Sequence, residues 1–200
     1  MTVRSARLFA LAFAMTVSTA GMPVAAQRGG AVPQLLDQDG LPILFTKLEV
    51  LLHKPGVLLV KDLYRIETRM TSGVTLDAIV VTEYGNQTDR LRGLRIELRD
   101  TLGKVGSSYV DYEEASALSQ SLAAMTELTS RFSGKDDQRS SDLRFASAGG
   151  FVASVHQSIR VQIATLTAGV VEPVTRTIEI ADFTSLKSVV DRALALLAEK

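Results

Sequence analysis

The spacing of apolar residues changes along the chain, and each change indicates a different secondary structure. From residue 43 onward, apolar residues recur at every second position, which is the period of a strand with one buried face. After Asp111 the period becomes 3.6 residues, as in an amphipathic helix, and both patterns then occur once more. The sequence therefore predicts strands, a helix, further strands and a second helix.

Short strands are expected in both halves of the chain, separated by turns rich in glycine, proline and small polar residues. One strand is apolar on both faces, because Ile79 and Val81 alternate with the apolar Val80. We therefore expect this strand to be covered on both sides. The expected strands span residues 43–52, 57–70, 74–84, 94–99, 109–110, 143–145, 151–157, 159–166 and 174–180.

Each predicted helix follows an aspartate. Asp111 precedes the first helix and Glu114 stands three residues later, as in a capping box. We expect this helix to continue to about residue 130. The second helix follows Asp182 and carries a wide apolar stripe, which we expect to pack on the sheet of residues 143–180 and on part of the first sheet. The stripe consists of Leu186, Val189, Val190, Ala193, Leu194 and Leu197.

The two strand-to-helix junctions resemble each other in sequence. Aligning their aspartates places Ala115, Leu118 and Leu122 of the first helix against Leu186, Val189 and Ala193 of the second. An internal duplication with halves 42–132 and 143–200 would produce this match, and so would ordinary capping chemistry. Short turns between strands favour antiparallel pairing, and helices separate from the strands favour an α+β fold. We expect antiparallel sheets of about seven to nine strands and two amphipathic helices in a single domain over residues 42–200.

The first 26 residues have the three-part pattern of a signal peptide. Arg4 and Arg7 precede an apolar run over residues 8–17, and Val24-Ala25-Ala26 offers small residues for cleavage before Gln27. A retained membrane anchor or a buried helix is the alternative. We expect a bacterial exported protein, periplasmic or extracellular, with a flexible leader over residues 27–41. No later apolar run is long enough to predict a transmembrane segment.

Composition removes several classes of function. The chain has 22 basic and 22 acidic side chains, so charge offers no argument for a nucleic-acid partner. It has no cysteine, which excludes zinc ribbons, iron–sulfur sites, disulfides and thiol catalysis. The glycine patterns of phosphate-binding loops do not occur either. We expect no cofactor.

Few residues have the spacing that catalysis or metal binding requires. His53 and His156 stand far apart and form no metal-binding motif, and no serine lies in a nucleophile-elbow pattern. Capping accounts for Asp111 and Glu114, and a negative first helical turn is favoured by the helix dipole. We therefore assign no catalytic or metal-binding residue.

A local cluster of arginines is the one candidate binding site. Arg92, Arg95 and Arg99 form a basic cluster with Arg90 and could bind an anion. Arg95 and Arg99 share one face of the expected strand, with Glu97 between them. The alternative is the solvated exterior of a sheet, where mixed charges form cross-strand ion pairs.

Three functions remain open. The first is an exported, non-catalytic α+β domain that binds an unidentified protein or ligand through a sheet face or loops. The second is a carrier of a small apolar ligand held between the sheet and the helices. The third is a hydrolase whose catalytic residues are dispersed along the chain.

Overall fold

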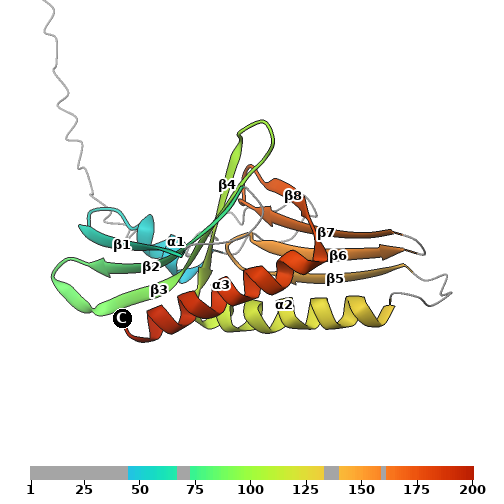
Figure 1. Cartoon of the computed structure of the whole chain (residues 1–200). Helices are drawn as coiled ribbons and strands as arrows, with labels where there is room; N and C mark the ends of the chain where they lie inside the picture. Colours follow the sequence, from blue (N-terminus) through green and yellow to red (C-terminus); the bar gives the residue numbers. More distant parts are fainter. Residues whose placement is uncertain (1–44, 67–72, 133–139, 159–160) are drawn as a thin grey trace, which may run out of the picture. The chain divides into compact units, whose positions relative to one another are not determined.

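The computed structural model describes residues 45–66, 73–132, 140–158 and 161–200. This part of the chain forms three helices and eight strands. Their arrangement is drawn in Figure 1. The expected signal peptide and leader lie outside the described residues and stay predictions.

The first half forms a four-stranded antiparallel sheet in the order β1-β2-β3-β4. A short helix precedes the sheet and a long helix follows it. Their bounds are α1 Lys47–Leu52, β1 Leu59–Ile66, β2 Val74–Glu83, β3 Asn86–Arg99, β4 Val105–Asp111 and α2 Tyr112–Phe132.

The second half has the same order of four antiparallel strands and a helix. Its elements are β5 Ser141–Ala146, β6 Val152–Ser158, β7 Val161–Ala168, β8 Val174–Ile178 and α3 Ile180–Ala198. The predicted α+β class, the antiparallel pairing and the alternation of strands and helices are confirmed. The short strand expected at 109–110 is longer, because the whole of β4 pairs with β3.

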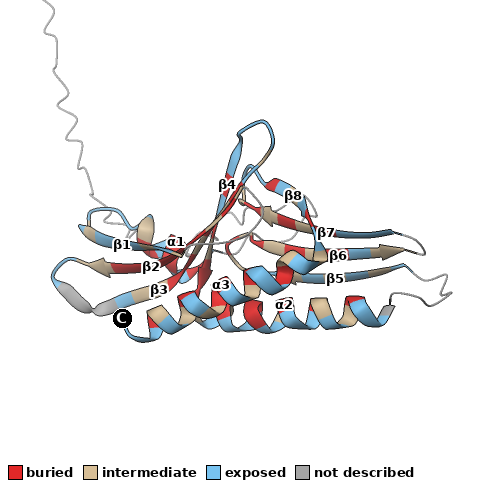
Figure 2. Cartoon of the chain, viewed as in Figure 1, coloured by how far each residue is buried: buried red, intermediate tan, exposed pale blue. Residues whose placement is uncertain are grey.

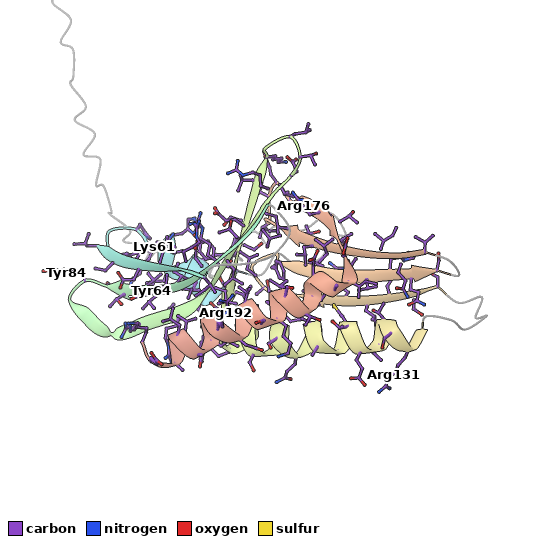
Figure 3. The ribbon with its side chains drawn as sticks, in the orientation of Figure 1. Lys61, Tyr64, Tyr84, Arg131, Arg176 and Arg192 are labelled. Carbon is purple, nitrogen blue, oxygen red and sulfur yellow. The ribbon has the colours of Figure 1, made fainter. Side chains whose placement is uncertain are left out.

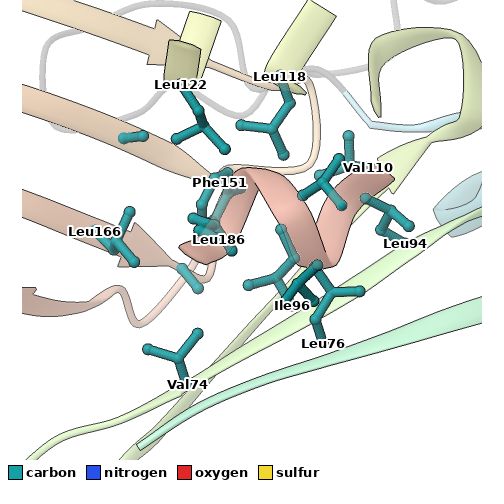
Figure 4. Close-up of a cluster of buried hydrophobic side chains, with 14 of the residues drawn as sticks. Val74, Leu76, Leu94, Ile96, Val110, Leu118, Leu122, Phe151, Leu166 and Leu186 are labelled. Atoms are coloured by element: carbon teal, nitrogen blue, oxygen red, sulfur yellow. The ribbon is translucent and has the colours of Figure 1, made fainter. Parts of the chain in front are cut away.

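One core joins the two halves. Helices α2 and α3 lie side by side and contribute their apolar stripes to a cluster that includes residues of both sheets (Figures 1 and 4). All three aligned pairs of the two stripes are buried. The expected apolar stripe of α3 is buried, with Leu194 partly buried at its margin and Phe183 added at its start. Its expected place on the sheet of the second half is wrong, because α3 lies mainly along β2 of the first sheet. Helix α2 is the one that contacts β5 and β6 of the second sheet.

The strand predicted at residues 43–52 is wrong, because residues 47–52 form helix α1. Alternating apolar residues suggested a strand, but Thr46 and Glu49 form a capping box at the start of a helix. The Glu49 N–H donates to Thr46 Oγ1 over 3.1 Å, and the Thr46 N–H donates to Glu49 Oε2 over 2.9 Å. Leu48 and Leu51, three residues apart, are buried on one side of this helix.

Helix α1 covers the face of the first sheet that is opposite α2 and α3. There it packs on Ile79 and Val81 of β2, which are fully buried. Val80, between them in sequence, belongs to the main core on the other face. The expected cover on both sides of this strand is therefore confirmed, and Figure 2 shows β2 as largely buried.

The halves meet where β4 contacts β7 and β8. Ser108 is fully buried there, and its Oγ accepts a hydrogen bond from the Gly169 N–H over 2.8 Å. A Cβ added to Gly106 would lie 2.2 Å from the carbonyl oxygen of Ala168 and 2.9 Å from Cβ of Val174. Only glycine permits this approach without displacement of the second half.

Candidate functional site

An open groove lies beside α1, at the end of the first sheet where β2 turns into β3. Its volume is about 750 Å³, within the range of small-molecule sites in proteins. The residues that line it are Phe45, Lys47, Val50, Leu51, His53, Lys54, Pro55, Glu83, Arg90 and Leu91. We call it the α1 groove.

Half of the α1 groove is apolar, and part of that surface is open to solvent. Phe45 is 51% exposed and Val50 is 63% exposed, although both are large apolar residues. Leu51 and Leu91 lie deeper and extend the small core beneath α1. Two exposed apolar side chains on one groove provide a surface on which an apolar ligand would displace water.

The rim of the α1 groove is mostly basic. Lys54 Nζ lies 2.6 Å from Glu83 Oε2, and Lys47 Nζ lies 3.1 Å from Oε1 of Glu113, which is outside the groove. The hydrogen bond to Glu113 raises the pKa of Lys47. A backbone hydrogen bond, followed by the one from Lys47, lowers the pKa of Glu113, so both groups are charged at neutral pH. Arg90 has no ion-pair partner within the described residues.

The start of helix α1 is held by a carboxylate from the end of β4, the edge strand of the first sheet. Asp111, the last residue of β4, accepts hydrogen bonds from the backbone N–H of Lys47 over 2.8 Å and of Leu48 over 3.2 Å. Its two oxygens thus serve the start of α1, whereas we expected them to cap α2. A six-residue helix is too short to be stable alone, so these bonds and the capping box hold one wall of the groove.

The sheet also has a recess for α1. A Cβ added to Gly93 of β3 would lie 2.5 Å from Cδ1 of Leu48 and 2.3 Å from the carbonyl oxygen of Val110. The missing side chain lets the buried Leu48 approach the backbone of the sheet. The position of the groove therefore depends on a glycine, an aspartate and a capping box that are far apart in sequence.

The three arginines of the expected anion site do not share one face of β3. Arg92 lies on the side of the long helices, where its Nη1 donates to the Leu197 carbonyl oxygen over 2.9 Å and its guanidinium lies 4.7 Å from the centre of the Tyr112 ring. Arg95 and Arg99 alternate onto the opposite face. The structure thus brings Arg95 and Arg99 to one face and separates Arg92 from them.

Arg95 is already surrounded by carboxylates. It forms an ion pair with Glu97, and its Nη1 lies 3.8 Å from Oδ2 of Asp77. Asp77 is buried and also accepts a hydrogen bond from Nε of Arg65 over 2.6 Å. Arg99 is exposed, and its Nη1 donates to the Gly103 carbonyl oxygen over 3.5 Å. This network has the mixed charges of a sheet exterior.

Both histidines have partners. His53 ends α1, and its Nδ1 donates to the Glu49 carbonyl oxygen over 2.8 Å, so Nδ1 carries a proton. His156 lies opposite Asp142 on neighbouring strands, with 2.6 Å between Nδ1 and Oδ1. In the described ranges, no serine or threonine hydroxyl forms a hydrogen bond with His156.

The carboxylates near the start of α2 also have separate tasks. Glu114 Oε1 accepts a hydrogen bond from the Ala148 N–H over 3.2 Å and so connects α2 to the turn before β6. Glu113 pairs with Lys47 at the surface. The capping box that we expected between Asp111 and Glu114 is therefore replaced by two contacts to other parts of the chain.

The described residues offer neither a metal-binding cluster nor a membrane-spanning helix. No cluster of three or more histidine, aspartate or glutamate side chains there could hold a metal ion. None of the helices in these ranges combines the length and apolar character that crossing a membrane requires. The chain matches no protein-family model, no curated protein and no solved structure.

Proposed function

We propose that this protein is an exported, non-catalytic domain that binds a small ligand with an apolar body in the α1 groove. The observation that carries the proposal is the groove itself, in which the exposed Phe45 and Val50 face a basic rim. Exposed apolar side chains gathered in a hollow mark binding sites more often than single exposed residues do.

Packing favours this groove over the space between the sheets and the long helices. The side chains between them, including Leu118, Leu186 and Phe151, are fully buried and in contact with one another (Figure 4). A ligand there would have to displace core side chains. Losing the packing of one large core side chain costs about 2–5 kcal/mol of folding free energy. A ligand in the α1 groove would displace only water.

Binding can be tested with N-phenyl-1-naphthylamine, a neutral probe that fluoresces in apolar surroundings. We expect saturable binding of one probe per chain. Val50→Glu should weaken binding by about tenfold or more, because it places a charge against the apolar floor. Val171→Glu is the matched control, since Val171 is 86% exposed and does not line the groove. Equal affinity of the two variants, or binding that does not saturate, would contradict the proposal.

Export has its own test. The full chain, expressed in a bacterium and recovered from the periplasm or the medium, should begin at Gln27 when its N-terminus is measured by mass spectrometry. Recovery of the chain from the cytoplasm with Met1 or Thr2 at its N-terminus would contradict export but would leave the groove as a binding site.

A further inference from the structure

The basic residues of the α1 groove differ in whether a carboxylate pairs with them, and this difference indicates what kind of ligand fits. Three basic side chains, Lys47, Lys54 and Arg90, line the groove together with one acidic side chain, Glu83. The two lysines have carboxylate partners, whereas Arg90 has none in the part of the chain that the structure describes. The lining of the groove therefore has an excess of positive charge, and Arg90 is the basic group there that no described carboxylate neutralises.

Arg90 is two residues from Arg92, so alternation on β3 starts its side chain on the face of the sheet opposite α1, yet Arg90 lines hollows that include the α1 groove. It lies opposite Thr82 in the β2–β3 pairing, beside an irregularity between Thr82 and Glu83. It lines the α1 groove and also a second hollow of about 530 Å³ bounded by Val60 and Tyr84. Tyr84 is 72% exposed and projects away from the ribbon beyond the β2–β3 turn (Figure 3). A head group at Arg90 would thus have room on either side.

The chemistry of arginine limits that head group. A guanidinium presents several N–H donors in one plane, which match the paired oxygens of a carboxylate or a phosphate. An ion pair at an exposed site is weak in water, but apolar contact beside it lowers the local dielectric and strengthens the attraction. Phe45, Val50 and Leu91 provide that apolar contact.

We propose that the ligand is a single-chain amphiphile with an anionic head, held by Arg90 at the head and by the apolar floor of the α1 groove along its chain. This inference rests on the proposed function, because it assigns the head group of the same ligand. A fatty acid and a monoalkyl phosphate share this chemistry. The free carboxylate and the phosphate are therefore separate arms of the test.

The test compares amphiphiles with twelve-carbon chains and different heads on the purified full-length protein. Laurate, dodecyl phosphate, neutral monolaurin and cationic dodecyltrimethylammonium each displace the naphthylamine probe, below their micelle concentrations. We expect the better of the two anions to bind about tenfold more tightly than monolaurin, and the cation to bind most weakly. The preference for an anion should decrease as salt is raised. The tighter anion identifies the head group.

A pair of arginine variants tests the role of Arg90. Arg90→Gln should lower the affinity for the anions to that of monolaurin and leave the affinity for monolaurin unchanged. Arg144→Gln is the control, because Arg144 is an exposed arginine on β5 that does not line the groove. Equal unfolding midpoints of the variants would show that neither change disturbs the fold.

The possible failures are distinguishable. Equal binding of anionic and neutral amphiphiles would overturn the anionic head and leave the proposed function intact. Tight anion binding that survives Arg90→Gln would overturn the assignment to Arg90. If the naphthylamine probe itself does not bind, the proposed function fails, and the inference fails with it. Binding of the probe without displacement by any amphiphile would overturn the single-chain ligand alone.

Discussion

The two halves differ most on the faces of their sheets that point away from α2 and α3. In the first half this face is covered in part by α1, which packs on Ile79 and Val81. In the second half the described residues place no helix there, and hydroxyls that pair across the strands lie on this face beside the exposed apolar residues Val161 and Ile163. Ser154 Oγ lies 2.8 Å from Thr165 Oγ1, and Thr167 Oγ1 lies 2.9 Å from Thr175 Oγ1.

This difference shows how one arrangement of strands supports two surfaces. Both halves have four antiparallel strands followed by a helix, so the order of elements does not decide which face is covered. The side chains at alternate strand positions decide which face is covered. Exposing the isoleucine and valine side chains of β2 to water would cost free energy. The threonine hydroxyls of β7 can form hydrogen bonds with water or with a neighbouring strand. The α1 groove lies beside a second apolar face of the first sheet, which α1 buries at Ile79 and Val81.

The largest expected effect compares these two faces directly. Ile79→Ala should lower the free energy of unfolding by about 2–5 kcal/mol, because Ile79 is fully buried under α1 and the change leaves a cavity. Thr165→Ala on the open face should cost only about 0.2–1 kcal/mol, the value of a cross-strand pair. Urea unfolding measures both. Equal losses would mean that the second face of the first sheet is no more a core than the open face is.

The seam between the halves provides the next comparison. Gly106→Ala should destabilise the protein by about 1–3 kcal/mol, because the new methyl group would overlap the carbonyl oxygen of Ala168. Gly103 in the neighbouring turn has a φ of 87° and open space around it, so Gly103→Ala should cost about 1 kcal/mol from backbone strain alone. Urea unfolding of the two variants should rank Gly106→Ala as the worse. A reversed ranking would mean that β4 does not pack closely on the second half.

One aspartate on each of these two faces allows a further comparison. Asp111→Ala should cost about 1–2 kcal/mol, because two N–H groups at the start of α1 lose their acceptor. It should also weaken probe binding in the groove, since α1 forms one wall. Asp142→Ala removes an exposed carboxylate that pairs with His156 and should stay within about 0.5 kcal/mol. Unchanged probe binding in Asp111→Ala would show that α1 keeps its place without this carboxylate.

The smallest expected effect concerns the helices, which both halves share. Asp191 of α3 accepts hydrogen bonds from Ser119 of α2 and from Lys187, each over 2.5 Å. Burial raises the pKa of the Asp191 carboxyl, but these hydrogen bonds outweigh burial and lower the pKa overall. Asp191 therefore stabilises the fold above the unfolded-state pKa of about 3.9, and this contribution is lost as pH falls through the lower pKa of the folded state.

Urea midpoints measured from neutral pH down to pH about 3 would test this pH dependence. Asp191→Asn should lower the midpoint slightly at neutral pH and should reduce its fall on acidification. Ser119→Ala should act in the same direction and more weakly, because Lys187 would still hold the carboxylate. An identical pH profile in the parent and in Asp191→Asn would contradict the role of Asp191.

Most of the fold could be predicted from the sequence, and the exception is instructive. Strands β1 and β2 and both long helices follow local apolar periods and appear where these periods indicate them, apart from their end residues. Strand β3 is predicted only in its second part, because it begins at Asn86 and the expected strand spans residues 94–99. Residues 47–52 alternate as a strand would, yet they form a helix. The pattern from Thr46 to Glu49 is a capping signal and could have identified it. A helix of this length is nevertheless marginal without tertiary contacts.

The candidate site was less predictable than the fold. Sequence grouped Arg90 with its neighbours and favoured Arg92, Arg95 and Arg99 for an anion. Alternation on β3 sends Arg92 to the helices, where the Leu197 carbonyl oxygen and Tyr112 engage it. Arg95 is neutralised by carboxylates that come from β2 and β3. Among the described residues, these neighbours decide which arginine has no ion-pair partner, and spacing along one strand does not reveal it.

The sequence by itself determined the order of the strands and the two long helices, the apolar stripes of those helices and the second apolar face of β2. These features follow from residues close in the chain, because periodicity alone decides which side of an element is apolar. Only the tertiary structure decided what covers that second face and where a ligand fits. The cover requires a carboxylate from Asp111 and a recess at Gly93, and both lie more than forty residues from α1. Their effect on a helix too short to form alone arises only once β3 and β4 are paired.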